Sequence, residues 1–106
     1  MADGVVFIPW YATGFRADAL AEAVGEIAAI AMRYGATDYA VYRSRDDRYK
    51  ITQTATFADK SDFERYWYGE EFTSFRAQHS SWYQVPTLYV WHDLVAAGSL
   101  APAPAE

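Results

Sequence analysis

The sequence predicts an α+β fold: one ferredoxin-like sandwich with a four-stranded antiparallel sheet and helices on one face of the sheet. Two observations lead to this prediction. First, strand-like and helix-like segments follow one another in the order strand, helix, hairpin, helix, strand, which is the split βαββαβ arrangement. Second, a chain of 106 residues with 52% hydrophobic residues suits one globular domain that buries its own core.

The first strand is expected at residues 5–11, a short apolar and aromatic run. Pro9 lacks a backbone N–H, so it favours an edge position or a local bulge in that strand. A helix is predicted over residues 17–34, because apolar residues recur there at intervals of three and four. Gly35 follows directly and is expected to end this helix in the left-handed conformation.

Two further strands, residues 37–43 and 49–57, are predicted on either side of the polar turn 44–48 and form a hairpin. The last strand is expected over residues 85–94. Both faces of the strands carry apolar or aromatic residues, whereas a single layer of helices covers only one face. We therefore expect the other face to pack against a second copy of the chain, which predicts a homodimer through the sheet face.

The second helical region follows the hairpin. Ser61 and Glu64 have the spacing of a capping box at its start, with Asp59 as a competing cap. Gly69 is expected to break the region into two segments, the second of which ends at His79.

The predicted domain covers residues 1–97, and the Ala/Pro-rich segment 98–106 is expected to be disordered. The absence of cysteine excludes disulfides, thiol catalysis and cysteine-ligated metal sites. A formal net charge of −5 argues against nucleic-acid binding. The sequence has no signal-peptide pattern and no apolar run of the roughly 20 residues that cross a membrane, so we expect a cytoplasmic protein.

His79 is the main candidate for chemistry. Helical spacing places it on the face that carries Phe72 and Phe75, so we expect its ring to point toward the sheet. An imidazole there could act as a general base, or ligate a metal or haem iron. The alternative is a histidine at a helix end that bonds a backbone carbonyl or a nearby carboxylate. His92, in the last strand, could line the pocket or lie in the dimer interface, and it is expected to be a buried, hydrogen-bonded structural histidine. Two histidines without cysteines predict no zinc site unless carboxylates help.

Aromatic residues make up 18% of the chain, and many gather around the second helical region. Such a wall suits a flat aromatic ligand, although the same residues could instead fill the core and the dimer interface. Arg76 lies in the same region and is expected to pair with an acidic neighbour at the surface. The aromatic cluster comprises Tyr66, Trp67, Tyr68, Phe72, Phe75, Trp82 and Tyr83.

The element order, the length and the segment DFERYWYGEEFTSFRAQHSSWYQVP (residues 62–86) resemble the dimeric α+β barrel superfamily. Within it, the chain is most similar to the antibiotic biosynthesis monooxygenase-like domains, over residues 5–95. The resemblance implies a homodimer in which two sheets face each other, with a pocket between the sheet and the helices of each protomer. Members include cofactor-independent oxygenases of polycyclic quinols, haem-degrading enzymes, and isomerases or dehydratases of small aromatic or lactone substrates.

The quinol oxygenases and haem-degrading enzymes of this superfamily often use an asparagine together with a tryptophan, and the haem-degrading enzymes add a histidine. Trp67 and His79 would match the tryptophan and the histidine. The asparagine has no counterpart, because the chain contains none. Gln53 or Thr13 could supply a substitute polar group.

Our hypothesis from the sequence is an enzyme that acts on a flat aromatic or quinone-like molecule, as a cofactor-independent monooxygenase. The predicted catalytic residues are His79 as the base, Trp67, and Tyr83 to orient the substrate. No cofactor is expected. The alternative is a non-catalytic homodimeric module that binds an aromatic metabolite or haem. The predicted substrate-binding residues are Tyr66, Phe72, Phe75, Trp82 and Gln53.

Overall fold

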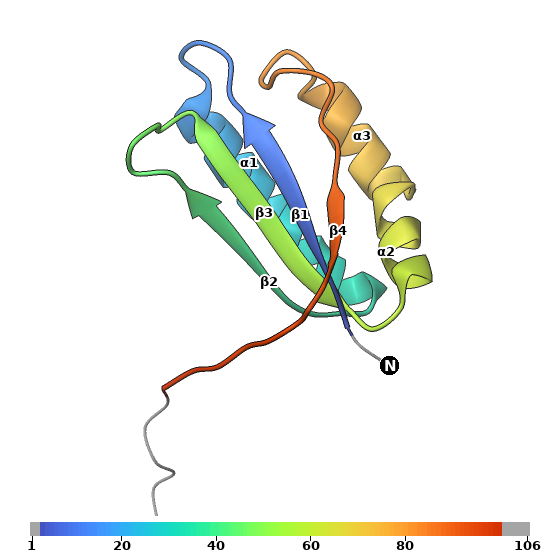
Figure 1. The fold of residues 1–106 in the computed structure, drawn as a ribbon. Coiled ribbons are helices and arrows are strands. Elements are labelled where there is room, and N and C mark those ends of the chain that lie inside the picture. Colours follow the sequence, from blue (N-terminus) through green and yellow to red (C-terminus); the bar gives the residue numbers. More distant parts are fainter. Residues whose placement is uncertain (1–2, 101–106) are drawn as a thin grey trace, which may run out of the picture.

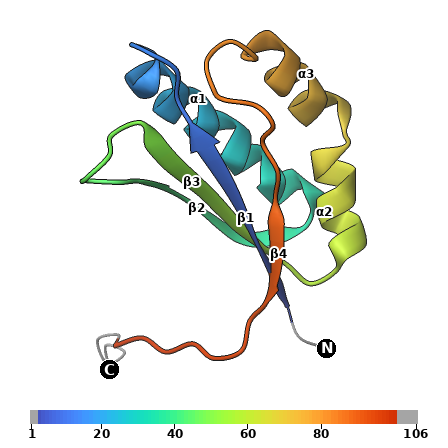
Figure 2. The ribbon, with the colours of Figure 1, turned by 45° about the horizontal axis from the view of Figure 1, so that its top comes forward.

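The computed structural model describes residues 3–100 and confirms the ferredoxin-like α+β fold (Figure 1). The strands pair antiparallel in the order β2-β3-β1-β4, and the helices all lie on one face of this sheet (Figures 1 and 2). The strands are β1 (Gly4–Tyr11), β2 (Ala36–Arg43), β3 (Lys50–Phe57) and β4 (Val90–Asp93). The helices are α1 (Ala17–Ile30), α2 (Lys60–Trp67) and α3 (Glu70–Gln78).

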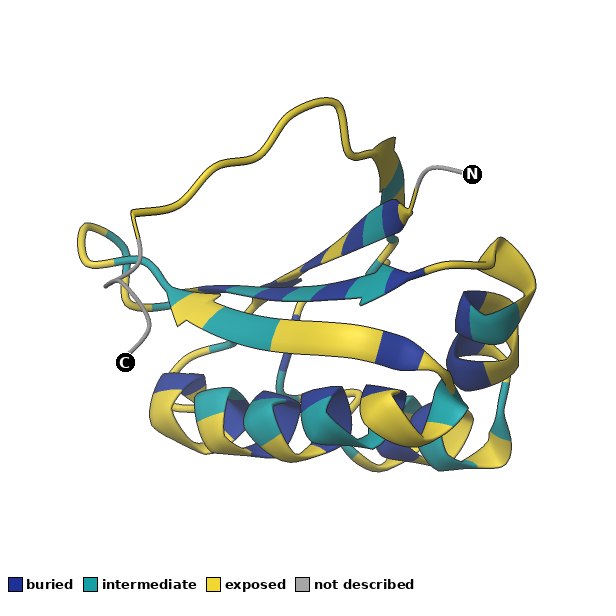
Figure 3. Cartoon of the chain, turned by 90° about the horizontal axis from the view of Figure 1, so that it is seen from below, coloured by how far each residue is buried: buried dark blue, intermediate teal, exposed yellow. Residues whose placement is uncertain are grey.

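The two inner strands, β1 and β3, alternate between buried and more exposed residues along their length (Figure 3). In β1 the buried set is Val6, Ile8 and Trp10, while Phe7 and Tyr11 face the opposite side. Successive side chains of a strand point to opposite faces, so this alternation means that one face of the sheet meets the helices and the other is open.

Aromatic rings fill the space between the sheet and the helices. Trp10 stacks on Phe72 with 6.1 Å between ring centroids and meets Tyr83 edge-on at 4.9 Å. Phe63 meets Tyr89 edge-on at 4.7 Å. The pocket that the resemblance implied between sheet and helices is therefore occupied by the protein's own side chains. The largest fully buried side chains are Trp10, Tyr66, Phe57, Phe63, Phe72, Ile8, Leu20, Ile51, Gln53, Val6 and Val24.

The first helix ends close to the predicted point. α1 stops at Ile30, and a short 3₁₀ turn, Ala31–Tyr34, carries the chain to Gly35. Gly35 has φ +102°, the left-handed conformation that the sequence predicts, and a Cβ there would lie 2.8 Å from Asp62 Oδ2. Both facts favour glycine at this position.

Alanine is expected to have opposite effects at two glycines. Gly35→Ala should lower the free energy of unfolding by about 1–2 kcal/mol, because a Cβ is strained in the left-handed region. Gly25→Ala should raise it by about 0.5–1 kcal/mol, because Gly25 lies inside α1 and an added Cβ meets no atom within 4 Å. Urea denaturation of the two variants measures both changes, and a loss of stability in Gly25→Ala would contradict the second.

The second helical region breaks at Gly69, as predicted, and α3 starts at the next residue. The capping box was wrong. α2 begins at Lys60 with Asp59 as its N-cap residue, and Ser61 lies inside the first turn. No side-chain hydrogen bond caps this helix. The helix starts two residues earlier than a Ser61 cap requires, and Asp59, the competing residue, takes the N-cap position.

The last strand is shorter than predicted. β4 pairs with residues 4–7 of β1, and beyond it only an isolated bridge joins Ala12 to Tyr83. Residues 84–89 thus stand opposite residues 8–11, so the two segments cannot keep a regular register. Pro9 sits in this irregular stretch of a central strand. Because the pairing is irregular here, the missing N–H of Pro9 removes no hydrogen bond from a regular ladder. Of the two predicted settings for Pro9, the local irregularity is therefore observed and the edge position is not.

The chain beyond β4 runs away from the body of the molecule (Figure 1), and residues 94–100 are exposed. Of the predicted disordered segment 98–106, residues 101–106 lie outside the described residues. In the described part of the chain, no helix has the length and apolar character needed to cross a membrane.

Candidate functional site

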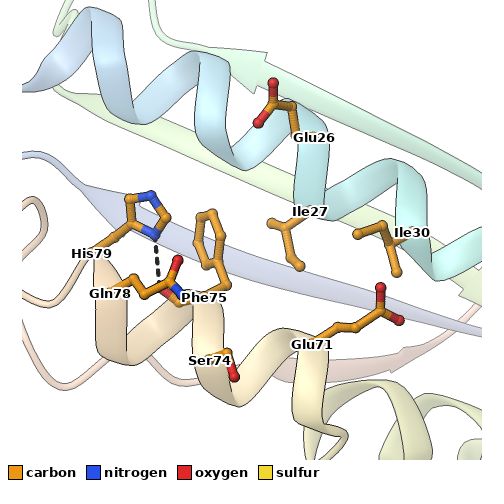
Figure 4. Close-up of a pocket in the computed structure, with 8 residues that line it drawn as sticks. All are labelled: Glu26, Ile27, Ile30, Glu71, Ser74, Phe75, Gln78 and His79. Carbon is orange, nitrogen blue, oxygen red and sulfur yellow. Dashed lines mark hydrogen bonds between the residues drawn. The ribbon is translucent and has the colours of Figure 1, made fainter.

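His79 lies in a groove between α3 and α1 (Figure 4). Its ring packs against Phe75 at 4.3 Å between centroids and meets Trp82 edge-on at 4.6 Å. The expectation that His79 points toward the sheet was wrong. His79 lies on the same side as Phe75, as its spacing predicts, but its ring sits in a groove lined by residues of α1 and α3 and not against the strands.

One ring nitrogen of His79 is anchored. Nδ1 lies 2.8 Å from the backbone oxygen of Phe75, which can only accept a hydrogen bond, so Nδ1 carries the hydrogen and donates it. In the neutral ring Nε2 then holds the lone pair, and no residue in the described part of the chain bonds it. This is the helix-end arrangement given above as the alternative, yet it leaves a base free to accept a proton.

We call the groove around His79 the α1–α3 groove. Its larger part has a volume of about 330 Å³, and its smaller part, of about 250 Å³, shares Glu26 and His79 with the first. Apolar side chains of both helices contribute to its walls. The first part is lined by Glu26, Ile27, Ile30, Glu71, Ser74, Phe75, Gln78 and His79, and the second by Ala19, Glu22, Ala23, Glu26, His79 and Trp82.

The carboxylates of the groove differ in their partners. Glu71 is engaged: one oxygen lies 2.7 Å from Arg33 Nη2, and the other accepts a hydrogen bond of 2.9 Å from the Tyr34 hydroxyl. That hydrogen bond raises the pKa of the Tyr34 phenol above its ordinary value. Glu22 and Glu26 form no ion pair with any described residue. Their negative charges therefore face the groove without compensation by a bonded cation.

Gln53 and Tyr66, two of the predicted substrate-binding residues, form a hydrogen-bonded network in the core. Gln53 Oε1 accepts from Trp10 Nε1 at 3.1 Å, and Gln53 Nε2 donates to the Tyr66 hydroxyl at 2.9 Å. The Tyr66 hydroxyl donates to the carbonyl of Ile27. Burial raises the pKa of Tyr66, so its phenol stays protonated at neutral pH. Each polar group here is bound to another part of the protein.

Trp67 and Tyr83, the other two predicted catalytic residues, gather around Arg76. The Arg76 guanidinium lies over the Trp67 ring at 4.3 Å, and its Nη2 donates to the Trp67 carbonyl at 3.0 Å. The Tyr83 hydroxyl donates to the Arg76 carbonyl at 3.1 Å. The expectation that Arg76 pairs with an acidic neighbour was wrong, and burial lowers the pKa of its guanidinium. Its Nη1 atom is buried with no hydrogen-bond partner among the described residues.

The predicted site residues therefore divide into two groups. Phe75 and Trp82 lie with His79 at the groove, whereas Phe72 packs inside the core with Tyr66 and Trp67. His92 is hydrogen-bonded, with Nδ1 at 3.2 Å from the carbonyl of Val5, but it is exposed on the open face of the sheet rather than buried.

No protein-family model matches the sequence, and no curated protein sequence matches it. Solved structures do match. PA3566 from Pseudomonas aeruginosa has a TM-score of 0.79 at 18% identity, over 91% of this chain and 97% of that one. SnoaB, a cofactor-independent oxygenase from Streptomyces nogalater, has a TM-score of 0.75 at 14% identity, over 92% and 97% of the two chains. An antibiotic biosynthesis monooxygenase has a TM-score of 0.75 at 13% identity, over 88% and 99%.

The chain has the antibiotic biosynthesis monooxygenase-like fold. At these identities the likeness establishes the fold, and the chemistry has to be argued from the residues of the site.

Within this monooxygenase-like fold, sequence reasoning missed the α1 side of the groove, including Glu22 and Glu26. Glu22 and Glu26 are one helical turn apart on α1, and the amphipathic pattern assigns both to the solvated side of that helix. Their i, i+4 spacing was the available sequence signal, because it places both carboxylates on the same face of the helix. In the described part of the chain no cluster of three or more potential metal ligands occurs.

Proposed function

We propose that this protein is a homodimeric enzyme that oxidises a flat hydroxylated aromatic or quinol-like molecule with molecular oxygen, without a cofactor. One observation carries the proposal: His79 is held by its Nδ1 hydrogen bond to Phe75, and its Nε2 atom is free in a groove with aromatic walls. SnoaB, which has the same fold, is a cofactor-independent oxygenase, and this supports the type of reaction.

In the proposed reaction, Nε2 of His79 removes a proton from the activated substrate and leaves an electron-rich carbanion or phenolate. This anion reacts with oxygen and forms a hydroperoxide at a ring carbon, and the imidazolium returns the proton. Loss of water then leaves a carbonyl group. A CH₂ group and O₂ become C=O and H₂O, so one oxygen atom enters the product and the other leaves as water. Glu26, which lines the same groove, would stabilise the transient imidazolium.

The proposed homodimer follows from the open face of the sheet. Phe7 is 42% exposed and Val90 51% exposed on neighbouring strands, and Tyr11 continues the same face. Contiguous apolar side chains on an uncovered sheet are typical of a protein interface. Sheet-to-sheet packing of two copies would cover them and leave the α1–α3 groove, on the opposite side of the molecule, open to substrate.

Oxygen uptake with a panel of anthrones and naphthohydroquinones tests the proposal. A positioned general base contributes about 10²–10⁴-fold to a rate, so His79→Ala should lower kcat at least about 100-fold on any substrate that the wild type oxidises. Thr73→Ala, on the exposed side of α3, serves as the matched control and should keep wild-type turnover. Wild-type turnover in His79→Ala would overturn the role of this residue, and no uptake across the panel would count against the proposed reaction.

A second candidate is a non-catalytic module that binds an aromatic metabolite, and the filled interior favours it. Oxygenase chemistry benefits from a site that excludes water, whereas the α1–α3 groove is open to solvent. Haem does not fit this groove. His79 Nε2 is a suitable iron ligand, but the uncompensated carboxylates of Glu22 and Glu26 beside it disfavour a group that carries two carboxylates of its own.

A further inference from the structure

The charges around the α1–α3 groove are unbalanced. Glu71 is neutralised by Arg33, but Glu22 and Glu26 have no ion-pair partner among the described residues. Arg16 brings a positive charge to one end of the groove, where its guanidinium lies 5.5 Å from the centre of the Trp82 ring. The carboxylates flanking His79 on α1 therefore leave this part of the groove negative.

The groove also has aromatic and apolar walls. Phe75 and Trp82 present rings on two sides of His79, and Ile27 and Ile30 add apolar surface from α1. A flat ring packs well against such walls. The faces of Trp and Phe rings also attract cations, as Arg16 already does at Trp82. Because Arg16 already lies over the Trp82 ring, the selection for positive charge comes from the carboxylates, and the rings hold the flat part of the ligand.

We propose that the α1–α3 groove binds flat aromatic molecules that carry a positively charged amino group. The ring packs in the larger part of the groove against Ile27, Phe75 and His79, and the ammonium group lies toward Glu26, with Glu22 in the adjoining smaller part. The proposal takes the groove as the substrate site and so rests on the proposed function, but the selection for charge is independent of the oxidation step. A volume of about 330 Å³ in the larger part is at the small end of the usual range for ligand sites, which suits a ligand of two or three rings.

Three naphthalene probes of nearly equal size test this selection: 2-naphthylmethylammonium, 2-naphthylmethanol and 2-naphthoate. Binding is followed by quenching of tryptophan fluorescence at low ionic strength. An exposed charge pair contributes a few-fold to affinity, so two carboxylates should make the ammonium probe bind about tenfold tighter than the carboxylate probe. Raising the salt to about 0.5 M should remove most of this difference, because exposed charges are screened.

Variants separate the groove from the rest of the surface. Glu22→Gln combined with Glu26→Gln should bring the ammonium probe to the affinity of the neutral alcohol. Glu64→Gln, which removes an exposed carboxylate from α2 outside the groove, should leave the order of the three probes unchanged. Equal affinity of the ammonium and alcohol probes for the wild type, or an unchanged preference in the double variant, would overturn the proposal.

The same proteins distinguish failure of this proposal from failure of the proposed function. If the ammonium probe binds in a manner that depends on Glu26 but no quinol consumes oxygen, the selection for charge stands and the oxygenase reaction is refuted. If quinols consume oxygen in a manner that depends on His79 while the three probes bind equally, the reaction stands and the selection for charge is refuted.

Discussion

Replacing Gln53 with leucine is expected to lower the free energy of unfolding by about 3 kcal/mol, because the buried Trp10 N–H would lose its partner and the Tyr66 hydroxyl would lose one of its two. In the structure Gln53 accepts a hydrogen bond from the indole of Trp10 and donates one to the hydroxyl of Tyr66. Leucine has a similar volume but can do neither. Each unsatisfied buried group costs about 1–3 kcal/mol, and the added apolar surface offsets part of that sum.

A thermal melt and urea denaturation of Gln53→Leu measure this effect, which should lower Tm by more than about 10 °C in a domain of this size. Thr52→Val, at a neighbouring position on the open face of β3, is the matched control and should change stability by less than about 0.5 kcal/mol. Combining Gln53→Leu with Tyr66→Phe should cost less than the sum of the two single changes, because both remove the same hydrogen bond. Full additivity would contradict the network.

The same network explains why the sequence could not locate the site. Aromatic residues spaced along the second helical region indicate a wall of rings, but composition does not tell whether the rings enclose a void or pack on one another. Here Tyr66, Phe72 and Trp67 contact each other directly, and Gln53 uses both of its polar atoms inside the core. A polar residue such as Gln53 in the middle of an apolar strand face is compatible both with lining a ligand pocket and with a hydrogen-bonded place in the core.

The fold was easier to predict from the sequence than the site, because it depends on local patterns. Apolar spacing identified α1, short strand-like runs identified β1 and β3, and Gly35 and Gly69 ended or separated helices as predicted, Gly35 in the left-handed conformation. The errors arose where tertiary context decides. The early start of α2 displaced the Ser61 cap, and the departure of residues 84–89 from β1 shortened the last strand. The shortened strand has no local sequence signal, whereas Asp59, the competing cap, was the local signal for the earlier start of α2.

The prediction that His79 points toward the sheet failed for a related reason. His79 lies on the side of Phe75 that its spacing predicts, but tertiary packing decides what that side of α3 faces. The residues across the groove from His79 come from α1, about fifty positions earlier in the chain. Only the packing of α3 beside α1 brings Glu26 and His79 to one groove, so a reading of local patterns assigns each of them to a separate surface.

Phe7→Asp is expected to weaken the proposed homodimer by at least about 100-fold. Phe7 lies on the open face of β1, 42% exposed in the single chain, and its ring meets His92 edge-on at 4.7 Å. In a dimer packed sheet against sheet this position would be enclosed by the partner. A carboxylate there would lose its hydration without a bonded cation, which costs several kcal/mol.

Sedimentation equilibrium of wild type and variant measures the dissociation constant. Met32→Asp is a matched control, since Met32 is 45% exposed, equally apolar, and lies with the helices on the other side of the sheet. The monomer of Phe7→Asp should keep its fold, because this side chain points away from the core, and the circular dichroism spectrum should be unchanged. A wild-type protein that stays monomeric at about 100 μM would contradict the dimer. Dissociation by Met32→Asp rather than Phe7→Asp would place the interface on the helices, where it would cover the α1–α3 groove and compete with the proposed ligand.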